Sequence, residues 1–301
     1  MHKSVLLDEC IKYLNLQEDS TIVDCTLGYG GHSSEILKRI KKGYLYAFDQ
    51  DIDAIEYSNK RLNKIASNYE IIHSNFVNIK EEVSKRTDHI DGILYDLGVS
   101  SPQLDQDERG FSFHNDADLD MRMNKDNSLS AYNVVNDYGE QQLIDILYRY
   151  GEEKYAKGIA KAIINNRPIN TTLQLVDVIK QAVPEKYSRL KHPARKTFQA
   201  IRIEVNDELN VFEKSLWDAL DLLNVGGRIC VITFHSLEDK ICKDIFKKVS
   251  SIKEEFKNMP VIPEQYQPKY KIVKTVKPNQ EEIKNNKRAR SAKLRVIERI
   301  R

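Results

Sequence analysis

The sequence predicts an α/β protein whose parallel sheet is covered by helices on both faces and is interrupted by an all-helical insertion. Short runs of β-branched and aromatic residues alternate with helical segments from residue 5 to residue 96, which is typical of right-handed β–α–β crossovers. Three of the twelve glycines, Gly28, Gly30 and Gly31, lie between the first strand and the helix that follows it. The alternation stops between residues 105 and 197, where only helical periodicity is found, and a strand pattern resumes at residue 226.

The first part of the chain is expected to contain four strands separated by helices. A short amphipathic helix over residues 5–14 leads into a strand that begins at Thr21. The helix after the glycine turn runs to Ile40, and Gly43 is its expected C-terminal stop. The other elements of this part are expected as strands at 44–49, 70–76 and 90–96 and as helices at 52–65 and 77–83.

The middle of the chain predicts helices only. Apolar residues recur at helical spacing over 143–150, 156–163 and 173–183, and Pro168 and Thr171 mark a helix start. A long helix ending near Leu223 then precedes a strand at 226–234, a proline-rich loop at 258–269 and two last strands at 270–276 and 293–300. The predicted domains are a main domain in two parts, 1–104 and 198–301, and a helical insertion for substrate recognition at 105–197.

Composition excludes several classes of protein. No apolar run approaches the roughly 18 residues of a membrane span, and Asp8 interrupts the N-terminal apolar stretch, so a cytoplasmic protein is expected. No two of the four cysteines form a C-x-x-C pair, so we expect them to be buried free thiols. We expect no disulfide, no zinc and no other metal. They are Cys10, Cys25, Cys230 and Cys242.

Positive charge is concentrated in two segments although the net charge is only +2. Residues 186–202 carry Lys and Arg without any acid, and in residues 284–301 the only acid is Glu298. Solvated helix faces and a frayed tail would explain each segment taken singly. Together the two segments indicate a polyanionic partner, because neutralising phosphates releases their counterions.

The glycine turn predicts a ligand that carries a nucleoside. Asp49 ends the second strand twenty-one residues after Gly28, where a carboxylate can accept the hydroxyls of a ribose. Nicotinamide dinucleotides and S-adenosylmethionine both fit this frame. Asp24, at the end of the first strand, would repel a pyrophosphate and attract a cationic sulfonium donor, which favours S-adenosylmethionine.

Two further strand ends are suited to a methyl transfer. Phe76 follows the third strand, where its ring can pack on an adenine or serve as an ordinary core aromatic. Asp96 ends the fourth strand and is our candidate for the acceptor of a proton from an amine nucleophile. In-line transfer from a sulfonium needs no metal, and alignment alone can lower a barrier by about 7–11 kcal/mol.

The chain resembles the bacterial RsmH family, also called MraW, in a series of motifs that spans nearly its whole length. The motifs are DLGVSSPQLD at 96–105, RGFSF at 109–113, DMRM at 120–123, YGEE at 150–153, HPAR at 192–195, TFQAIR at 197–202, FHSLED at 234–239 and RARSAKLR at 288–295.

The resemblance implies a fold, an activity and a donor site. It implies a Rossmann-like class I S-adenosylmethionine methyltransferase sheet with a helical insertion, and methylation of N4 of a cytidine in the decoding region of small-subunit ribosomal RNA. The expected partner is then that RNA or the small ribosomal subunit, and no membrane partner is expected. A homodimer is possible. The residues aligned with the donor-holding positions of the family are Gly30, Gly31, His32, Asp49, Phe76, Asp96 and Gln103.

The residues near the substrate leave two alternatives open. Arg109, Phe111 and Phe113 can stack on an extruded base, or Phe111 and Phe113 can anchor the insertion to the sheet. His235, with Glu238, can touch the base or cap a helix, and Arg288 and Arg290 are expected to bind RNA.

The role of Asp96 and the activity itself also have alternatives. Amino methyltransferases that act on bases commonly carry Pro-Pro and an aromatic after the fourth-strand acid, whereas Leu97 and Gly98 follow Asp96 here, so Asp96 either catalyses or only holds the donor. The alternative functions are a non-catalytic RNA-binding assembly factor and a nicotinamide-dependent oxidoreductase.

Overall fold

A computed structural model describes residues 4–100, 103–104, 106–190, 192–252, 254–256 and 261–301. The chain forms two compact units, of which unit 1 comprises residues 1–98 and 209–301 and unit 2 comprises residues 99–208. The boundaries drawn from the sequence were 105 and 197. Unit 2 extends past residue 197 because its last long helix, α11 (Arg195–Asn206), crosses that position.

Unit 1 is built on a seven-stranded sheet with the order β3-β2-β1-β4-β5-β7-β6. Strands β1 to β5 pair in parallel, and β7 runs antiparallel to both of its neighbours, β5 and β6. This mixed sheet with surrounding helices confirms the predicted α/β, Rossmann-like class. The strands are β1 (Thr21–Asp24), β2 (Tyr44–Asp49), β3 (Tyr69–His73), β4 (Gly92–Asp96), β5 (Arg228–Thr233), β6 (Tyr270–Val276) and β7 (Lys293–Arg299).

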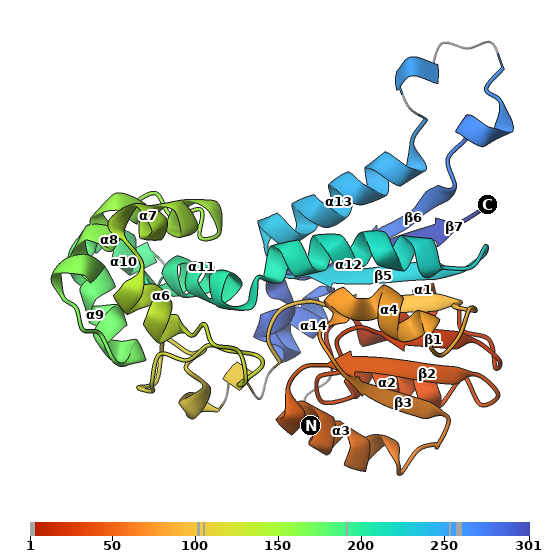
Figure 1. The fold of residues 1–301 in the computed structure, drawn as a ribbon, viewed down its shortest axis with the longest axis horizontal. Coiled ribbons are helices and arrows are strands. Elements are labelled where there is room, and N and C mark those ends of the chain that lie inside the picture. The colour runs from red at the N-terminus through yellow and green to blue at the C-terminus, as the bar shows by residue number, and fades with distance from the viewer. Residues whose placement is uncertain (1–3, 101–102, 105, 191, 253, 257–260) are drawn as a thin grey trace. The chain divides into compact units, whose positions relative to one another are not determined.

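Helices cover both faces of the sheet because successive strand residues point to opposite sides. Val23, Tyr46 and Ile93 pack on one face against α4 (Ile79–Ser84), α12 (Glu208–Leu222) and α13 (Ser236–Ser250) (Figure 1). Ile22 and Leu94 point to the other face, which carries α1 (Leu7–Leu14), α2 (Gly31–Leu37) and α3 (Ile52–Leu62). Of the remaining elements of unit 1, the structure describes η1 (Phe76–Asn78), η3 (Glu254–Phe256), η4 (Glu264–Tyr266), α14 (Gln280–Asn285) and η5 (Lys287–Ser291).

Two local predictions in unit 1 were wrong in detail. Gly43 does not stop α2, which ends at Leu37; a Cβ at Gly43 would lie 1.9 Å from the Ser20 carbonyl oxygen, so close backbone packing explains the glycine. Phe76 does not extend the third strand, because β3 ends at His73 and Phe76 opens the turn η1. Within the predicted loop at 258–269, residues 258–260 lie outside the described residues.

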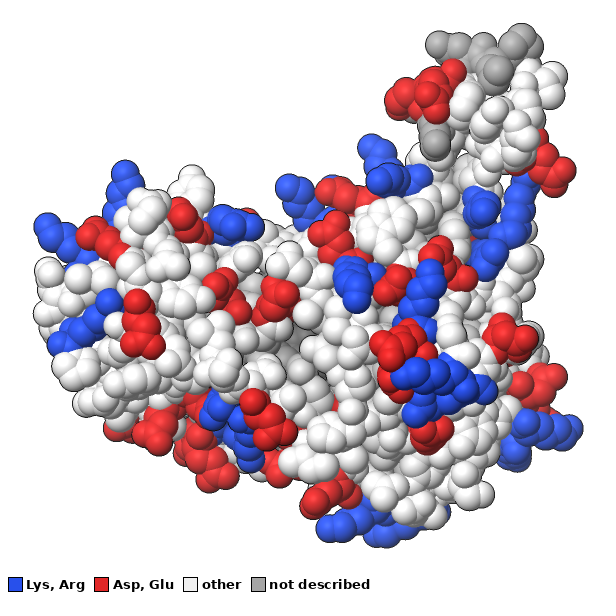
Figure 2. All heavy atoms as spheres, in the orientation of Figure 1, with Lys and Arg blue, Asp and Glu red and all other residues white. Residues whose placement is uncertain are grey.

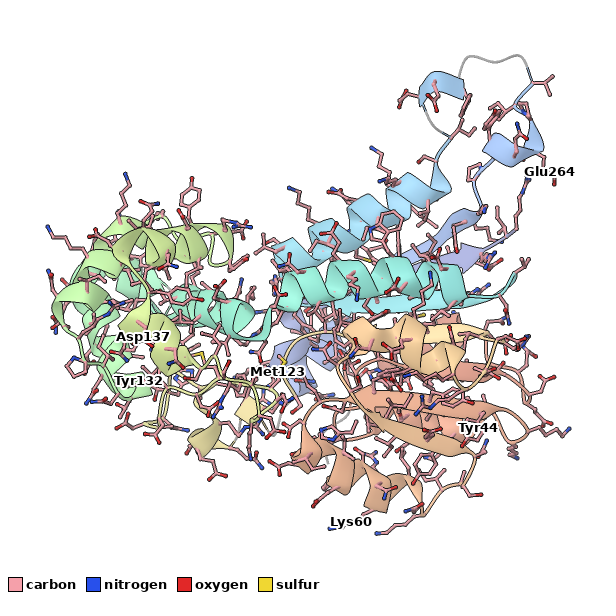
Figure 3. All side chains as sticks on the ribbon, viewed as in Figure 1. Tyr44, Lys60, Met123, Tyr132, Asp137 and Glu264 are labelled. Atoms are coloured by element: carbon pink, nitrogen blue, oxygen red, sulfur yellow. The ribbon has the colours of Figure 1, made fainter. Side chains whose placement is uncertain are left out.

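Unit 2 has a core of its own, formed by helices that its apolar periodicity predicts. Thr171 caps α9 (Thr172–Ala182) by accepting the Gln174 N–H, as its place in the sequence indicates. Tyr132 and Asp137, labelled in Figure 3, lie in α6 (Ala131–Asp137). The described helices are η2 (Asp107–Arg109), α6 (Ala131–Asp137), α7 (Glu140–Arg149), α8 (Ala156–Asn165), α9 (Thr172–Ala182), α10 (Glu185–Leu190) and α11.

Two general predictions can be checked on the described residues. All four cysteines are free and buried, as expected. Within the described ranges, no helix combines the length and the apolar character that crossing a membrane would demand.

Candidate functional site

The candidate site of unit 1 lies at the carboxyl ends of the parallel strands. Asp24, Asp49 and Asp96 are the last residues of β1, β2 and β4. Tyr44, labelled in Figure 3, opens β2 at the opposite end of the strand from Asp49. In a parallel α/β sheet this carboxyl edge is the usual place for a ligand, and the predicted donor-binding residues of unit 1 gather there.

The glycine turn and Asp49 are joined by hydrogen bonds. The Gly28 N–H donates to Asp49 Oδ2 over 2.8 Å, and the Asp51 N–H donates to Asp49 Oδ1 over 2.9 Å. Gly28 and Gly30 have φ values of +50° and +71°, a conformation that favours glycine. Burial raises the pKa of Asp49 to about 6, although these N–H donors oppose the shift.

Asp24 lies beneath the same turn with only 1% of its surface exposed. Its carboxylate accepts the Ser33 hydroxyl over 2.6 Å and the Thr26 N–H over 3.1 Å. Burial raises the pKa of Asp24 above its ordinary value. The Asp24 carboxylate therefore holds the glycine turn in place by hydrogen bonds. Because it is buried, it can attract a cationic ligand only through the turn and not by direct contact.

Asp96 faces His32 across the first crossover. The Asp96 N–H donates to Thr26 Oγ1 over 2.7 Å, and Asp96 Oδ2 lies 3.6 Å from His32 Nδ1. The other oxygen, Oδ1, is buried without a hydrogen-bond partner among the described residues. Burial, with Asp24 and Glu238 as nearby negative charges, raises the pKa of Asp96 to about 8. A carboxyl with this pKa can exchange a proton near neutral pH.

Phe76 is held at the edge of the site by β4 and α12. Its ring meets the Tyr95 ring edge-on with centroids 5.6 Å apart, and its carbonyl accepts the Ser215 hydroxyl over 2.9 Å. Tyr95 also bonds to Ser215 with 2.7 Å between their hydroxyl oxygens. No motif in the sequence marks Tyr95 and Ser215 as supports of Phe76, because the contact between β4 and α12 exists only in the folded chain.

His235 and Glu238 cap α13. Glu238 Oε2 accepts the Phe234 N–H over 2.7 Å and the His235 N–H over 3.3 Å, and Oε1 lies 3.0 Å from His235 Nε2. The capping alternative is therefore present in the structure. A contact of His235 with a base stays a prediction.

Gln103, Arg109 and Phe111 are buried inside unit 2. Gln103 Oε1 accepts the Ser100 N–H over 2.9 Å. Arg109 Nη2 donates to the carbonyl of Arg122 over 3.0 Å and to that of Met123, which is labelled in Figure 3. Arg109 and Phe111 are only 3% and 5% exposed, and Phe111 packs in the core of unit 2, so stacking of either side chain on a base stays a prediction.

Phe113 is the aromatic of this motif that keeps part of its surface exposed. Its ring stacks on His192 with centroids 4.4 Å apart and meets Phe198 edge-on at 5.7 Å. The grouping of Phe113 with His192 joins two of the family-like motifs, RGFSF and HPAR, which are far apart in the sequence.

The basic C-terminal segment is not a frayed tail, because η5 and β7 together make up most of it. Lys293 and Arg295 both bond to Asp239 over 2.8 Å, so their charges are paired. Arg288 and Arg290 lie in η5, and Arg290 is exposed. On the face drawn in Figure 2, basic and acidic side chains are interspersed within each unit.

Comparison with known proteins identifies the family of this chain. The profile of the MraW methylase family matches residues 1–300. A protein of Exiguobacterium sibiricum named ribosomal RNA small subunit methyltransferase H is 51% identical over 306 residues, with 99% of this chain and 98% of that protein covered. A protein of the same name from Mycoplasma capricolum is 54% identical over 305 residues, with the same coverage. The chain therefore belongs to the MraW methylase family.

Proposed function

We propose that this protein transfers a methyl group from S-adenosylmethionine to N4 of a cytidine in small-subunit ribosomal RNA. The observation that carries the proposal is the identity of 51–54%, over nearly the full length of both chains, to proteins named ribosomal RNA small subunit methyltransferase H. The family assignment favours methyl transfer over the oxidoreductase and the non-catalytic assembly factor.

The residues of the carboxyl edge fit such a donor. Asp49 offers a carboxylate beside the glycine turn for ribose hydroxyls, and Phe76 offers a partly exposed ring for an adenine. Asp96 Oδ1, buried without a partner among the described residues, is an acceptor that a bound amino group can satisfy. With Gly30, Gly31, His32 and Gln103 these are the residues we propose for donor binding.

The bound donor supplies an electrophilic methyl carbon. The N4 lone pair of the base forms the new N–C bond while the electron pair of the breaking C–S bond goes to sulfur, and the proton of N4 leaves to the Asp96 carboxylate. An exocyclic amine is a poor nucleophile because the ring delocalises its lone pair. Asp96 therefore contributes by accepting the N–H, which directs the lone pair away from the ring and takes up the proton.

For the RNA we propose contacts with Phe113, His235, Arg288 and Arg290, because these side chains are partly or fully exposed in their units. Arg109 and Phe111 would position this surface from within unit 2. Arginines in the short turn η5 suit phosphate groups, and Phe113 suits a base.

The decisive experiment offers the protein labelled S-adenosylmethionine and small ribosomal subunits from cells that lack it. Mass spectrometry of the RNA nucleosides is expected to find the label in N4-methylcytidine. Label on protein, or on a different nucleoside, would contradict the proposal, and RNA binding without transfer to either naked RNA or subunits would favour an assembly factor.

A further inference from the structure

His32 is a buried histidine whose two ring nitrogens face different partners. The residue is 5% exposed, with Nε2 3.2 Å from the Val5 carbonyl oxygen and Nδ1 3.6 Å from Asp96 Oδ2. A carbonyl oxygen can only accept a hydrogen bond, so Nε2 carries the hydrogen and Nδ1 presents its lone pair to Asp96. Burial lowers the pKa of His32 to about 4, which keeps the ring neutral at physiological pH.

The surroundings of Asp96 favour the protonated form of its carboxyl group. Besides burial, the negative charges of Asp24 at the end of β1 and of Glu238 in α13 raise the pKa of Asp96. The charge of Asp96 in turn adds to the burial that raises the pKa of the Cys10 thiol on α1. Once Asp96 is protonated, its O–H is a donor, and a hydrogen-bond acceptor nearby stabilises and orients it. The lone pair on His32 Nδ1 is such an acceptor.

We propose that His32 is a positioning residue for Asp96, which offers Nδ1 as hydrogen-bond acceptor when Asp96 takes the proton of the target amine. The proposal rests on the proposed function and gives His32 a task other than touching the donor. The proton passes from N4 of the base to Asp96, the resulting carboxylic acid donates to His32 Nδ1, and the proton later leaves Asp96 for water. His32 itself neither gains nor loses a proton.

The N-terminal segment fixes the imidazole for this task. Val5 accepts from Nε2, and the Leu6 N–H next to it donates to Glu282 Oε1 over 2.7 Å, which ties the segment to α14. The separation of 3.6 Å between His32 and Asp96 is longer than a hydrogen bond. Catalytic hydrogen bonds are commonly long before substrate binds and shorten in the complex.

Two substitutions separate the two nitrogens of His32. The terminal group of Gln in His32→Gln takes the place of Nε2 and keeps a donor for Val5, but leaves nothing at the Nδ1 position. The terminal group of Asn in His32→Asn takes the place of Nδ1 and keeps an acceptor for Asp96, but loses the bond to Val5. The two variants thus serve as matched controls for each other.

We expect His32→Gln to lower the single-turnover methylation rate by about tenfold and His32→Asn to lower it by less than about threefold. Loss of the acceptor disfavours protonated Asp96, so the apparent pKa of the rate profile falls by about one unit in His32→Gln only. The thermal unfolding midpoint should stay close to the wild type in both variants, and affinity for S-adenosylhomocysteine, which His32 is also proposed to support, should change to the same extent in the two. A profile of His32→Gln that matches the wild type, or equal loss in both variants, would overturn the proposal, as would a loss of stability and affinity that accounts for the rate.

A second measurement does not require any activity. In ¹⁵N-histidine spectra of the free protein, the His32 signal, assigned as the one absent in His32→Gln, should show the neutral ring with the hydrogen on Nε2 from pH 6 to 8. A hydrogen on Nδ1, or a charged ring, would contradict the inference. If the protein shows the expected tautomer but methylates no ribosomal RNA, the proposed function fails and the geometry of the pair stands.

Discussion

Gly28 and Asp49 are joined by a hydrogen bond of 2.8 Å from the Gly28 N–H to Asp49 Oδ2, although 21 residues separate them in the chain. The bond fixes the glycine turn of the first crossover to the end of β2. The carboxylate that is proposed to accept ribose hydroxyls is thus also the group that shapes the turn.

Asp49→Ala should weaken S-adenosylhomocysteine binding by about tenfold or more, because two hydroxyl donors lose a charged acceptor. RNA affinity should be nearly unchanged, since the ribose contact is remote from the RNA phosphates. Isothermal titration calorimetry measures the first quantity and filter binding the second. Asp49→Asn, which keeps one oxygen but no charge, should fall between wild type and Asp49→Ala.

Donor affinity should also depend on pH through Asp49. The pKa of this acid is raised to about 6, so the carboxylate is ionised above that pH and protonated below it. Only the ionised form accepts both hydroxyls, and affinity should therefore be constant above about pH 7 and fall as the pH drops through 6. Calorimetry between pH 5 and 8 checks this expectation, and an equal pH dependence in Asp49→Asn would assign it to another group.

Gly43→Ala should destabilise unit 1. Its Cβ would lie 1.9 Å from the backbone oxygen of Ser20, which cannot rotate away as a side chain can. Overpacking of this kind costs about 1–3 kcal/mol in the free energy of unfolding. Gly139→Ala is the control, because the nearest atom to its Cβ is a side-chain oxygen at 3.5 Å. Urea unfolding that shifts equally in both variants would refute this account of Gly43.

Arg288→Ala with Arg290→Ala should reduce RNA affinity and make its salt dependence shallower. Each lost phosphate contact lowers the slope of log K against log salt by about 1. Lys85→Ala is the control, since Lys85 is an exposed lysine already paired with Glu81 on α4. RNA binding is measured from 50 to 300 mM salt. The same slope for the wild type and the double variant would show that η5 does not contact RNA phosphates.

The thiols of the native protein should resist modification. Burial raises the pKa of all four cysteines, and the thiolate is the reactive form. Ellman's reagent at pH 8 is expected to find no rapidly reacting thiol in the folded protein and all four in guanidinium chloride. Rapid reaction of one cysteine in the folded state would show that its segment opens.

The sequence was most informative where local chemistry decides the structure. The β-branched run at β1, the acids at the strand ends and the glycine turn are all short-range signals, and each marks an element that the structure contains. Thr171 is another such signal, because its hydroxyl caps the helix that begins beside it.

Contacts between distant segments could not be predicted in this way. Gly43 looked like a helix stop, but its reason is the backbone of Ser20. Arg109 looked like a cation for a base, but its guanidinium is buried against carbonyls of residues 122 and 123. The pairing of His32 with Asp96 also depends on folding, since nothing in either motif indicates which ring nitrogen faces the carboxylate.

Because β7 lies between β5 and β6, the sheet of unit 1 cannot be completed until the end of the chain has been synthesised. Thr233 of β5 pairs with Lys293 of β7, and Leu6 at the other end of the chain bonds to Glu282, 276 positions later. A nascent chain that has emerged only as far as α13 therefore lacks the neighbour of β5 and the anchor of its N-terminal segment. Unit 2 is one continuous stretch, residues 99–208, and needs neither, so its helices can pack before β6 and β7 of unit 1 have been synthesised.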